Sequence, residues 1–190
     1  KKLQWDKVRV LVANYCNYKC PFCHNEGQGK TTTKERMSLQ SFRRLVDILS
    51  NQPISEFNIS GGEPFLNEDI VDMILYINDN LDCDISCATN LSLIKPEHIS
   101  VLSGTRIKFN IQFPFATAEA FKQSTVTGNL DRILTNIDLL CAENIQVGLN
   151  TVVQSDDFSS ISTLIDFALE RGLPLKLLPQ IGLSGSNQFL

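Results

Sequence analysis

The sequence predicts an α/β protein built on a parallel β-sheet. Six short runs rich in β-branched and apolar residues alternate along the chain with stretches of helical periodicity. Strands that alternate with helices in this way pair in parallel and are joined by right-handed crossovers. At 190 residues the chain suits a single domain, residues 1–190. An open doubly wound sheet and a partial barrel both fit this pattern.

The first two strand–helix units begin with a Val-rich run at 7–13. An amphipathic stretch at 38–52 follows after a cysteine-containing loop, and Ser38 is the predicted N-cap of that helix. The second strand is predicted at 56–60 and its helix at 67–80, where apolar residues recur with helical spacing. Both strands are short, and the first is mostly apolar, as buried parallel strands are.

The third and fourth units follow the same plan. A strand at 83–88 leads to a helix at 95–104, in which Pro96 suits the first turn because no partner is needed there for its missing N–H. A strand at 106–113 leads to a helix at 128–144, whose apolar residues again recur with helical spacing. These two units extend the predicted parallel sheet to four strands.

The last part of the chain adds two more strands. The run at 145–153 leads to a helix at 157–172, with Gly172 as the residue that ends it, and the final strand is predicted at 175–181. In parallel sheets the functional loops gather at the carboxyl ends of the strands. The cysteine loop and a glycine-rich turn both follow predicted strands, so we expect the site at that edge.

The amino-acid composition limits the classes of molecule that the protein is expected to bind. Hydrophobic residues make up 43% of the chain and charged residues 20%, as in ordinary soluble proteins. The net charge of -4 and the pI of about 5.2 argue against a nucleic-acid partner. No apolar run is long enough to cross a membrane, and no signal peptide is evident. We therefore expect a cytoplasmic protein, with no membrane partner, that acts on a small molecule or a peptide.

Three of the six cysteines stand in one loop after the first predicted strand: Cys16, Cys20 and Cys23. The spacing CxxxCxxC can wrap one corner of a cubane iron–sulfur cluster, which leaves the fourth iron open to a substrate or cofactor. A zinc site completed by His24 or by a distant cysteine is one alternative, and unrelated buried thiols are another. Cys83, Cys87 and Cys141 are expected to be core residues.

Two motifs make the chain resemble the radical S-adenosylmethionine superfamily. One is CxxxCxxC with the aromatic Phe22 before its third cysteine, and the other is GGEP at 61–64, directly after the second strand. The resemblance implies a partial (βα)6 TIM-like barrel with parallel strands. It also implies a [4Fe–4S] cluster that reductively cleaves S-adenosyl-L-methionine to a 5′-deoxyadenosyl radical, which abstracts hydrogen from a substrate. Flavodoxin or ferredoxin is the implied one-electron reductant.

Within the superfamily, nearly the whole chain resembles the GTP cyclases of molybdopterin synthesis, for example in "VRVLVANYCNYKCPFCHNEG" and "TGNLDRILTNIDLL". The resemblance implies that the contacts to S-adenosylmethionine are Phe22, Gly61, Gly62, Glu63, Gln112 and Ile181. The cyclases have Ser at position 112, but the amide of Gln112 can still form a hydrogen bond to the ribose or carboxylate. Candidate substrate contacts are His24, Asn150 and Arg9, which matches an arginine that the cyclases use on GTP.

Three positions argue against GTP as the substrate. Asn58, Ala88 and Gly148 stand where the cyclases have polar or basic residues. Loss of an arginine at 58 and a lysine at 148 removes charge-assisted contacts to a triphosphate worth about 1.5 to 3 kcal/mol each. We therefore expect a peptide or a natural-product precursor. A GTP cyclase, a glycyl-radical activase and a non-catalytic zinc or cluster module are the alternatives. We also expect residues 1–190 to be the core domain without the C-terminal segment that holds a second cluster in the cyclases.

Overall fold

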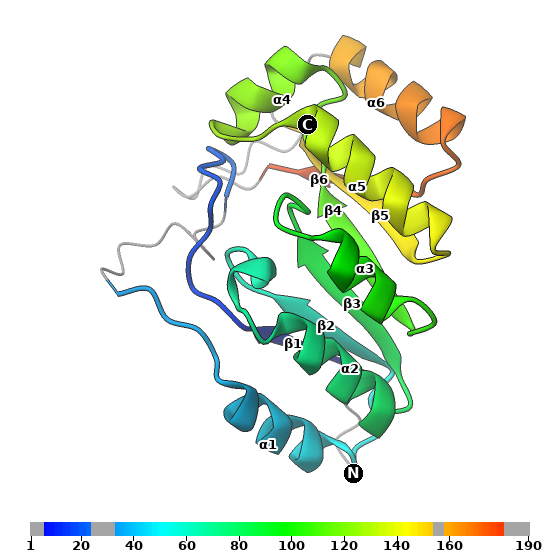
Figure 1. Cartoon of the computed structure of the whole chain (residues 1–190). Helices are drawn as coiled ribbons and strands as arrows, with labels where there is room; N and C mark the ends of the chain where they lie inside the picture. The colour runs from blue at the N-terminus through cyan, green and yellow to red at the C-terminus, as the bar shows by residue number, and fades with distance from the viewer. Residues whose placement is uncertain (1–5, 24–32, 154–157, 181–190) are drawn as a thin grey trace.

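The computed structural model describes residues 6–23, 33–153 and 158–180. Its centre is one sheet of six parallel strands in the order β1-β2-β3-β4-β5-β6 (Figure 1). The strands are β1 (Lys7–Leu11), β2 (Glu56–Ser60), β3 (Asp84–Thr89), β4 (Ile107–Gln112), β5 (Gln146–Val153) and β6 (Leu175–Pro179). All six predicted strands are present, so the α/β class is confirmed.

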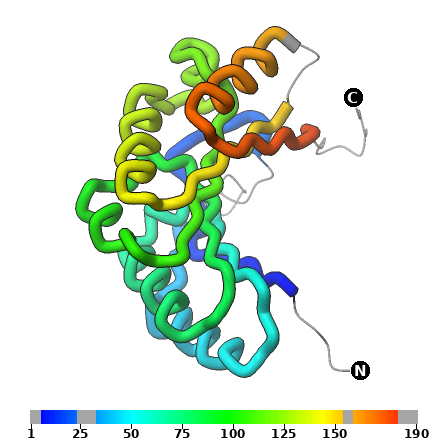
Figure 2. Tube along the Cα trace, turned by 90° about the vertical axis from the view of Figure 1, so that its right-hand side faces the viewer, coloured from blue at the N-terminus to red at the C-terminus, as the bar shows by residue number. Residues whose placement is uncertain are grey.

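The strand order decides between the two architectures. A doubly wound sheet reverses its strand order at a switch point and carries helices on both faces. Here the order runs from β1 to β6 without a reversal, and Figure 2 shows the helices on one side of a curved sheet. The partial barrel expected from the sequence is therefore confirmed, and the doubly wound alternative is wrong.

The described residues form six α-helices and one short 3-10 helix: α1 (Leu39–Leu49), η1 (Pro64–Leu66), α2 (Ile70–Asn80), α3 (Pro96–Leu102), α4 (Ala118–Thr125), α5 (Leu130–Ala142) and α6 (Phe158–Glu170). Ser38 caps α1 as predicted, because its hydroxyl accepts a hydrogen bond from the N–H of Ser41 at 3.2 Å. Gly172, at φ +63°, ends α6 as predicted. Neither η1 nor α4 was predicted from the sequence, because η1 spans only three residues and Phe121 is the single large apolar residue of α4. None of these helices is long and apolar enough to cross a membrane.

The two faces of the sheet differ in polarity. On the face that meets the helices, Phe57, Ile85 and Ile107 form one buried row across three strands. The row on the other face is polar and consists of Arg9, Asn58, Ser86, Lys108 and Gln146. Because side chains alternate along each strand, the same strands supply the core and the inside of the barrel.

The cysteines outside the cluster loop only partly follow the expectation. Cys83 and Cys87 are buried as predicted, but Cys141 is exposed, so its assignment to the core was wrong. It follows Leu140, which is fully buried on α5. One residue further along a helix turns the side chain by about 100°, which places Cys141 outside the apolar stripe.

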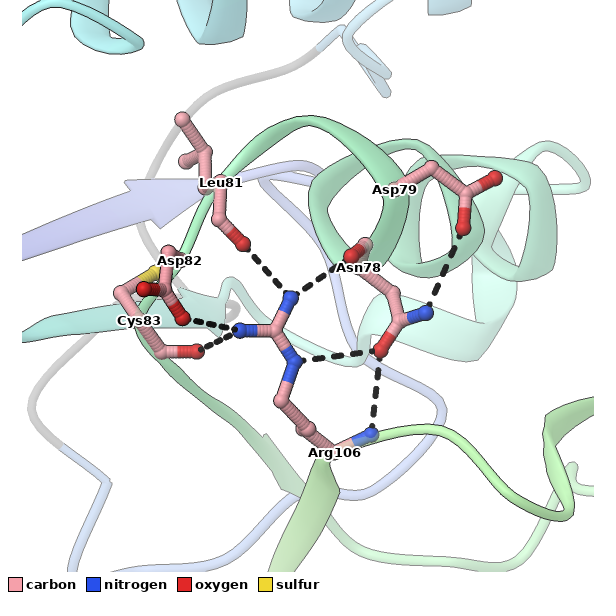
Figure 3. A network of polar contacts seen from close by, with 6 residues as sticks. All are labelled: Asn78, Asp79, Leu81, Asp82, Cys83 and Arg106. Atoms are coloured by element: carbon pink, nitrogen blue, oxygen red, sulfur yellow. Dashed lines mark hydrogen bonds and ion pairs between the residues drawn. The ribbon is translucent and has the colours of Figure 1, made fainter.

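Arg106 joins the end of α2 to the starts of β3 and β4 at the edge of the sheet opposite the cysteine loop (Figure 3). Its guanidinium donates hydrogen bonds to the carbonyl oxygens of Asn78 and Leu81, both at 2.6 Å, and of Cys83 at 3.1 Å. The last carbonyls of a helix lack partners within the helix and carry a partial negative charge. Arg106 therefore satisfies these acceptors with a planar cation.

Replacing Arg106 with methionine is expected to lower the free energy of unfolding by about 1–2 kcal/mol, because the three carbonyl oxygens lose a charged donor. The partial exposure of the side chain keeps the loss from being larger. Urea unfolding measures it, and Arg44→Met on the exposed side of α1 serves as the control. Equal losses in both variants would contradict this role.

Candidate active site

A cavity of about 400 Å³ lies at the carboxyl ends of the strands, and all six strands contribute to its wall. This volume is typical of sites for small molecules. The lining contains these residues that the sequence analysis had selected: Arg9, Cys16, Cys20, Phe22, Cys23, Gly61, Gly62, Gln112 and Asn150. Glu63 does not line the cavity, while His24 and Ile181 lie outside the described residues. The predicted motifs therefore meet at one place.

The cysteine loop is held in position by hydrogen bonds from two other parts of the fold. The N–H of Tyr18 donates to Cys16 Sγ at 3.3 Å, and the side-chain amide of Asn90 reaches the same sulfur at 3.7 Å. Further along the loop, the N–H of Lys19 donates to the carbonyl oxygen of Thr125 at the end of α4, at 3.2 Å. The protein thus orients Cys16 through contacts that do not depend on a metal.

The three thiols suit a cluster as a set of donors. Burial raises the pKa of Cys16 and raises that of Cys20 to about 12, because a thiolate is poorly solvated there. Binding of iron would replace these protons. Within residues 6–23, 33–153 and 158–180, no three Cys, His, Asp or Glu side chains converge as the ligands of one metal ion would. A cubane needs no such convergence, since each thiolate binds a different iron.

The GGEP turn packs directly against the backbone that enters the cysteine loop. Gly61 has φ +154°, and a Cβ at this position would lie 2.5 Å from the carbonyl oxygen of Ala13. The N–H of Gly62 donates to that oxygen at 2.9 Å, and the N–H of Glu63 donates to the carbonyl oxygen of Tyr15 at 3.0 Å. Gly61 is needed for this close approach of two loops. A contact of either glycine with a cofactor stays a prediction.

Glu63 braces the loop after β3 from a fully buried position. Its carboxylate accepts hydrogen bonds from the N–H of Phe65 at 3.1 Å, the hydroxyl of Thr89 at 2.7 Å and the N–H of Asn90 at 2.8 Å. Burial raises the pKa of Glu63 despite these donors. The side chain acts on the site through Asn90, which in turn contacts Cys16.

Two buried polar atoms of the cavity wall have no hydrogen-bond partner in the described part of the chain: Gln112 Nε2 and the hydroxyl of Tyr18. Buried polar groups are nearly always paired, so unpaired donors on residues that line a cavity suit a bound molecule there. Nearby, the guanidinium of Arg9 donates to Ser60 Oγ at 2.8 Å. The cavity therefore offers hydrogen-bond donors to a bound molecule, as the carboxylate and ribose of S-adenosylmethionine require.

Among the cavity residues that were not selected from the sequence, Tyr18 lies within the cysteine loop and Asn90 contacts Cys16. Asn90 follows β3 at the edge where functional residues gather, so its position was a usable signal. Tyr18 gave no such signal, because an aromatic residue inside a loop can be packing, ligand contact or neither.

The sequence model of the protein family described as the Radical SAM superfamily matches residues 10–168 of this chain. The chain belongs to the radical SAM superfamily. Members of this family are enzymes that use a [4Fe–4S] cluster and S-adenosylmethionine, so both predicted cofactors are confirmed at the level of the family. The three cavity thiols and the unpaired Gln112 donor fit these groups.

Relatives of this radical SAM chain include GTP 3′,8-cyclases. The cyclase of Clostridium perfringens (strain 13 / Type A) is 27% identical over 97% of this chain and 58% of its own length. A probable GTP 3′,8-cyclase of Thermococcus kodakarensis is 29% identical over 90% of this chain and 55% of its own length. The chain thus spans a little over half of each relative. The predicted resemblance to the molybdopterin-synthesis branch is confirmed.

Solved radical SAM structures share the fold. Streptococcus suis SuiB bound to S-adenosylmethionine has a TM-score of 0.85 at 17% identity, over 98% of this chain and 43% of SuiB. SuiB bound to the precursor peptide SuiA has a TM-score of 0.84. The enzyme anSMEcpe with bound AdoMet has a TM-score of 0.76 at 16% identity, over 93% of this chain and 52% of its own. At these identities the likeness concerns the fold alone.

Proposed function

We propose that this chain is the catalytic core of a GTP 3′,8-cyclase-like enzyme, which generates a 5′-deoxyadenosyl radical in the cavity and abstracts hydrogen from a purine nucleotide. The observation that carries the radical chemistry is that three thiols and an unpaired amide donor line one cavity. The nucleotide is suggested by relatives that are 27% and 29% identical and named for GTP.

Each part of the cavity wall has a distinct task in this proposal. Cys16, Cys20 and Cys23 would hold three irons of the cluster. When bound, the cluster and S-adenosylmethionine supply the 5′-deoxyadenosyl radical. Gln112 would donate a hydrogen bond from Nε2 to an oxygen of the cofactor, and Phe22 would form an apolar wall beside it. These residues fix the cofactor and keep water from the reacting atoms.

Positive charge on the inside of the barrel supports an anionic substrate. Arg9 lines the cavity, and the described lining contains no Asp or Glu. Lys108 is half-buried in the same row as Arg9, while Lys176 on β6 is paired in register with Asn150, which also lines the cavity. A triphosphate carries several negative charges and would gain from such cations.

Lys108, on the neighbouring strand, lies beside Gly148, where the cyclases have a lysine of their own. A Cβ built on Gly148 would lie 3.5 Å from Lys108 Cε, so the neighbouring strand brings a lysine into the space beside the glycine. At the other position, Asn58 donates to Ser86 Oγ at 2.7 Å and belongs to a polar network on that face. Lys108 places a cation beside Gly148 and so supports the nucleotide over the peptide expected from the sequence, whereas Asn58 supplies no charge at its position. The peptide remains the second candidate because SuiB, which binds the peptide SuiA, shares this fold.

Reconstitution tests the proposal on the full-length protein. After anaerobic loading with iron and sulfide, about four irons should bind at the cysteine loop of each chain, and reduction should yield 5′-deoxyadenosine. Mass spectrometry should then find deuterium in 5′-deoxyadenosine when GTP deuterated on the ribose is supplied. A colourless protein with one zinc would contradict the radical chemistry. Deuterium transfer from a labelled peptide but not from GTP would contradict the nucleotide alone.

Replacing Lys108 with methionine should weaken binding of GTP about tenfold or more, because one charge-assisted contact is lost. Isothermal titration of the anaerobic, cluster-loaded protein measures the dissociation constant. Lys122→Met, on the exposed side of α4, changes the net charge equally and is the control. If both variants weaken binding to the same extent, the effect is one of overall charge and Lys108 has no direct contact.

A further inference from the structure

Tyr18 stands out among the cavity residues because the proposed function assigns no role to its hydroxyl. It lies between Cys16 and Cys20 in the loop "CNYKC" and is only 4% exposed. The ring packs in the hydrophobic core, while the residue also lines the cavity. Its hydroxyl is buried without a hydrogen-bond partner among the described residues. A phenylalanine would fill the same space without leaving a polar atom unpaired.

The nearest candidate partner on the protein is already occupied. Ser92 lies near Tyr18, but the two hydroxyls do not reach hydrogen-bond geometry. The hydroxyl of Ser92 donates to Asn90 Oδ1 at 2.6 Å and accepts from Asn17 Nδ2 at 2.8 Å. Ser92 is therefore held in another network. The Tyr18 hydroxyl is left for a group in the cavity.

The chemistry of the hydroxyl makes it a donor at neutral pH. A phenolic hydroxyl ordinarily loses its proton only at about pH 10, far above neutral pH. The proton therefore stays on the oxygen. An acceptor is expected close to the two flanking cysteines, and the sulfurs of an iron–sulfur cluster are hydrogen-bond acceptors.

We propose that the Tyr18 hydroxyl donates a hydrogen bond to a sulfur of the cluster and so raises its reduction potential. The inference rests on the cluster of the proposed function and adds one residue to it. The reduced cluster carries one more negative charge than the oxidised cluster, so a donor at its sulfur stabilises the reduced state more. Reduction is the step that precedes cleavage of S-adenosylmethionine. Tyr18 would thereby make the cluster easier to reduce with a cellular electron donor.

The test is the reduction potential of the anaerobically reconstituted Tyr18→Phe variant, followed by electron paramagnetic resonance of the reduced cluster. The variant keeps the ring and should still bind about four irons. The ratio of reduced to oxidised cluster at a fixed potential should fall about tenfold, which is a shift of about 59 mV for a one-electron couple. Tyr76→Phe is the control, because that hydroxyl donates to Asp47 at 2.7 Å on the helical side of the sheet.

Three results would overturn the inference. An unchanged potential in an iron-replete Tyr18→Phe variant would mean that the hydroxyl does not touch the cluster. An altered affinity for S-adenosylmethionine at an unchanged potential would assign the hydroxyl to that molecule. If the variant fails to bind iron, fluorotyrosine is placed at position 18 of a Tyr15→Phe, Tyr76→Phe background. The hydroxyl of fluorotyrosine is more acidic than that of tyrosine and is therefore a stronger hydrogen-bond donor, so the reduction potential of the cluster should rise. An unchanged reduction potential would overturn the inference. Absence of iron from the unsubstituted protein would instead contradict the proposed function.

Discussion

Replacing Gly61 with alanine is expected to destabilise the protein by about 2–4 kcal/mol and to reduce the iron that the cysteine loop binds. The new Cβ would lie 2.5 Å from the carbonyl oxygen of Ala13, and 3.1 Å from the nitrogen of the same residue. Both atoms belong to the backbone, so neither can turn away as a flexible side chain would. Overpacking of this kind costs about 1–3 kcal/mol, and the φ of +154° adds strain for any residue with a Cβ.

A second glycine with positive φ separates crowding from backbone strain. Gly104 has φ +80°, yet a Cβ there would meet no atom within 4 Å. Gly104→Ala should therefore cost only the strain of that conformation, about 1 kcal/mol. Urea unfolding gives both stabilities, and iron analysis after reconstitution shows whether the loop is still formed. Equal losses in the two variants would refute the packing of Gly61 against Ala13 as the cause.

The local pattern of residue types in the sequence was sufficient to predict most of the strands and helices. The strand at 56–60 was predicted with the bounds that β2 has, because a short segment between a Pro-containing turn and a glycine pair has few alternatives. Strand order was beyond the reach of the pattern, since alternating strands and helices fit both a doubly wound sheet and a partial barrel. Only the resemblance to a family, and then the pairing of the strands, separated the two.

The candidate site also contains residues that the sequence pattern reveals and residues that it does not. Cys16, Cys20 and Cys23 could be found because cluster ligands lie close together in the chain and their spacing is itself the signal. Asn90 reaches Cys16 from 74 residues away, and no spacing rule connects them. The absence of a lysine at Gly148 argued against GTP when positions were compared one by one. The contact with Lys108 depends on the register of β4 and β5, which the sequence does not state.

Replacing Glu63 with alanine is expected to destabilise the protein by about 3–5 kcal/mol. The carboxylate accepts three hydrogen bonds at a position with no exposed surface, so alanine would leave the donors of Phe65, Thr89 and Asn90 unpaired and open a void. Asn90 would also lose the contact that sets its position beside Cys16. Denaturant unfolding measures the stability, and Glu68→Ala is the control. Glu68 is exposed and forms a surface ion pair with Arg36 at 2.8 Å, which is worth at most about 1 kcal/mol.

The pH dependence of the effect of Glu63→Ala shows whether folding shifts the titration of the buried carboxyl group. Burial raises the pKa of Glu63 in the folded protein above its ordinary value of 4.5. A carboxyl group whose pKa is raised by folding stabilises the protein most at a pH below its pKa in the unfolded state. That part of the stability is lost as the pH rises through its pKa in the folded state. The difference in stability between the unsubstituted protein and Glu63→Ala should therefore shrink as the pH rises from about 4.5 through the raised pKa of Glu63. A difference that stays constant with pH would mean that the carboxyl group has the same pKa in the folded and the unfolded protein, so that burial does not shift its titration.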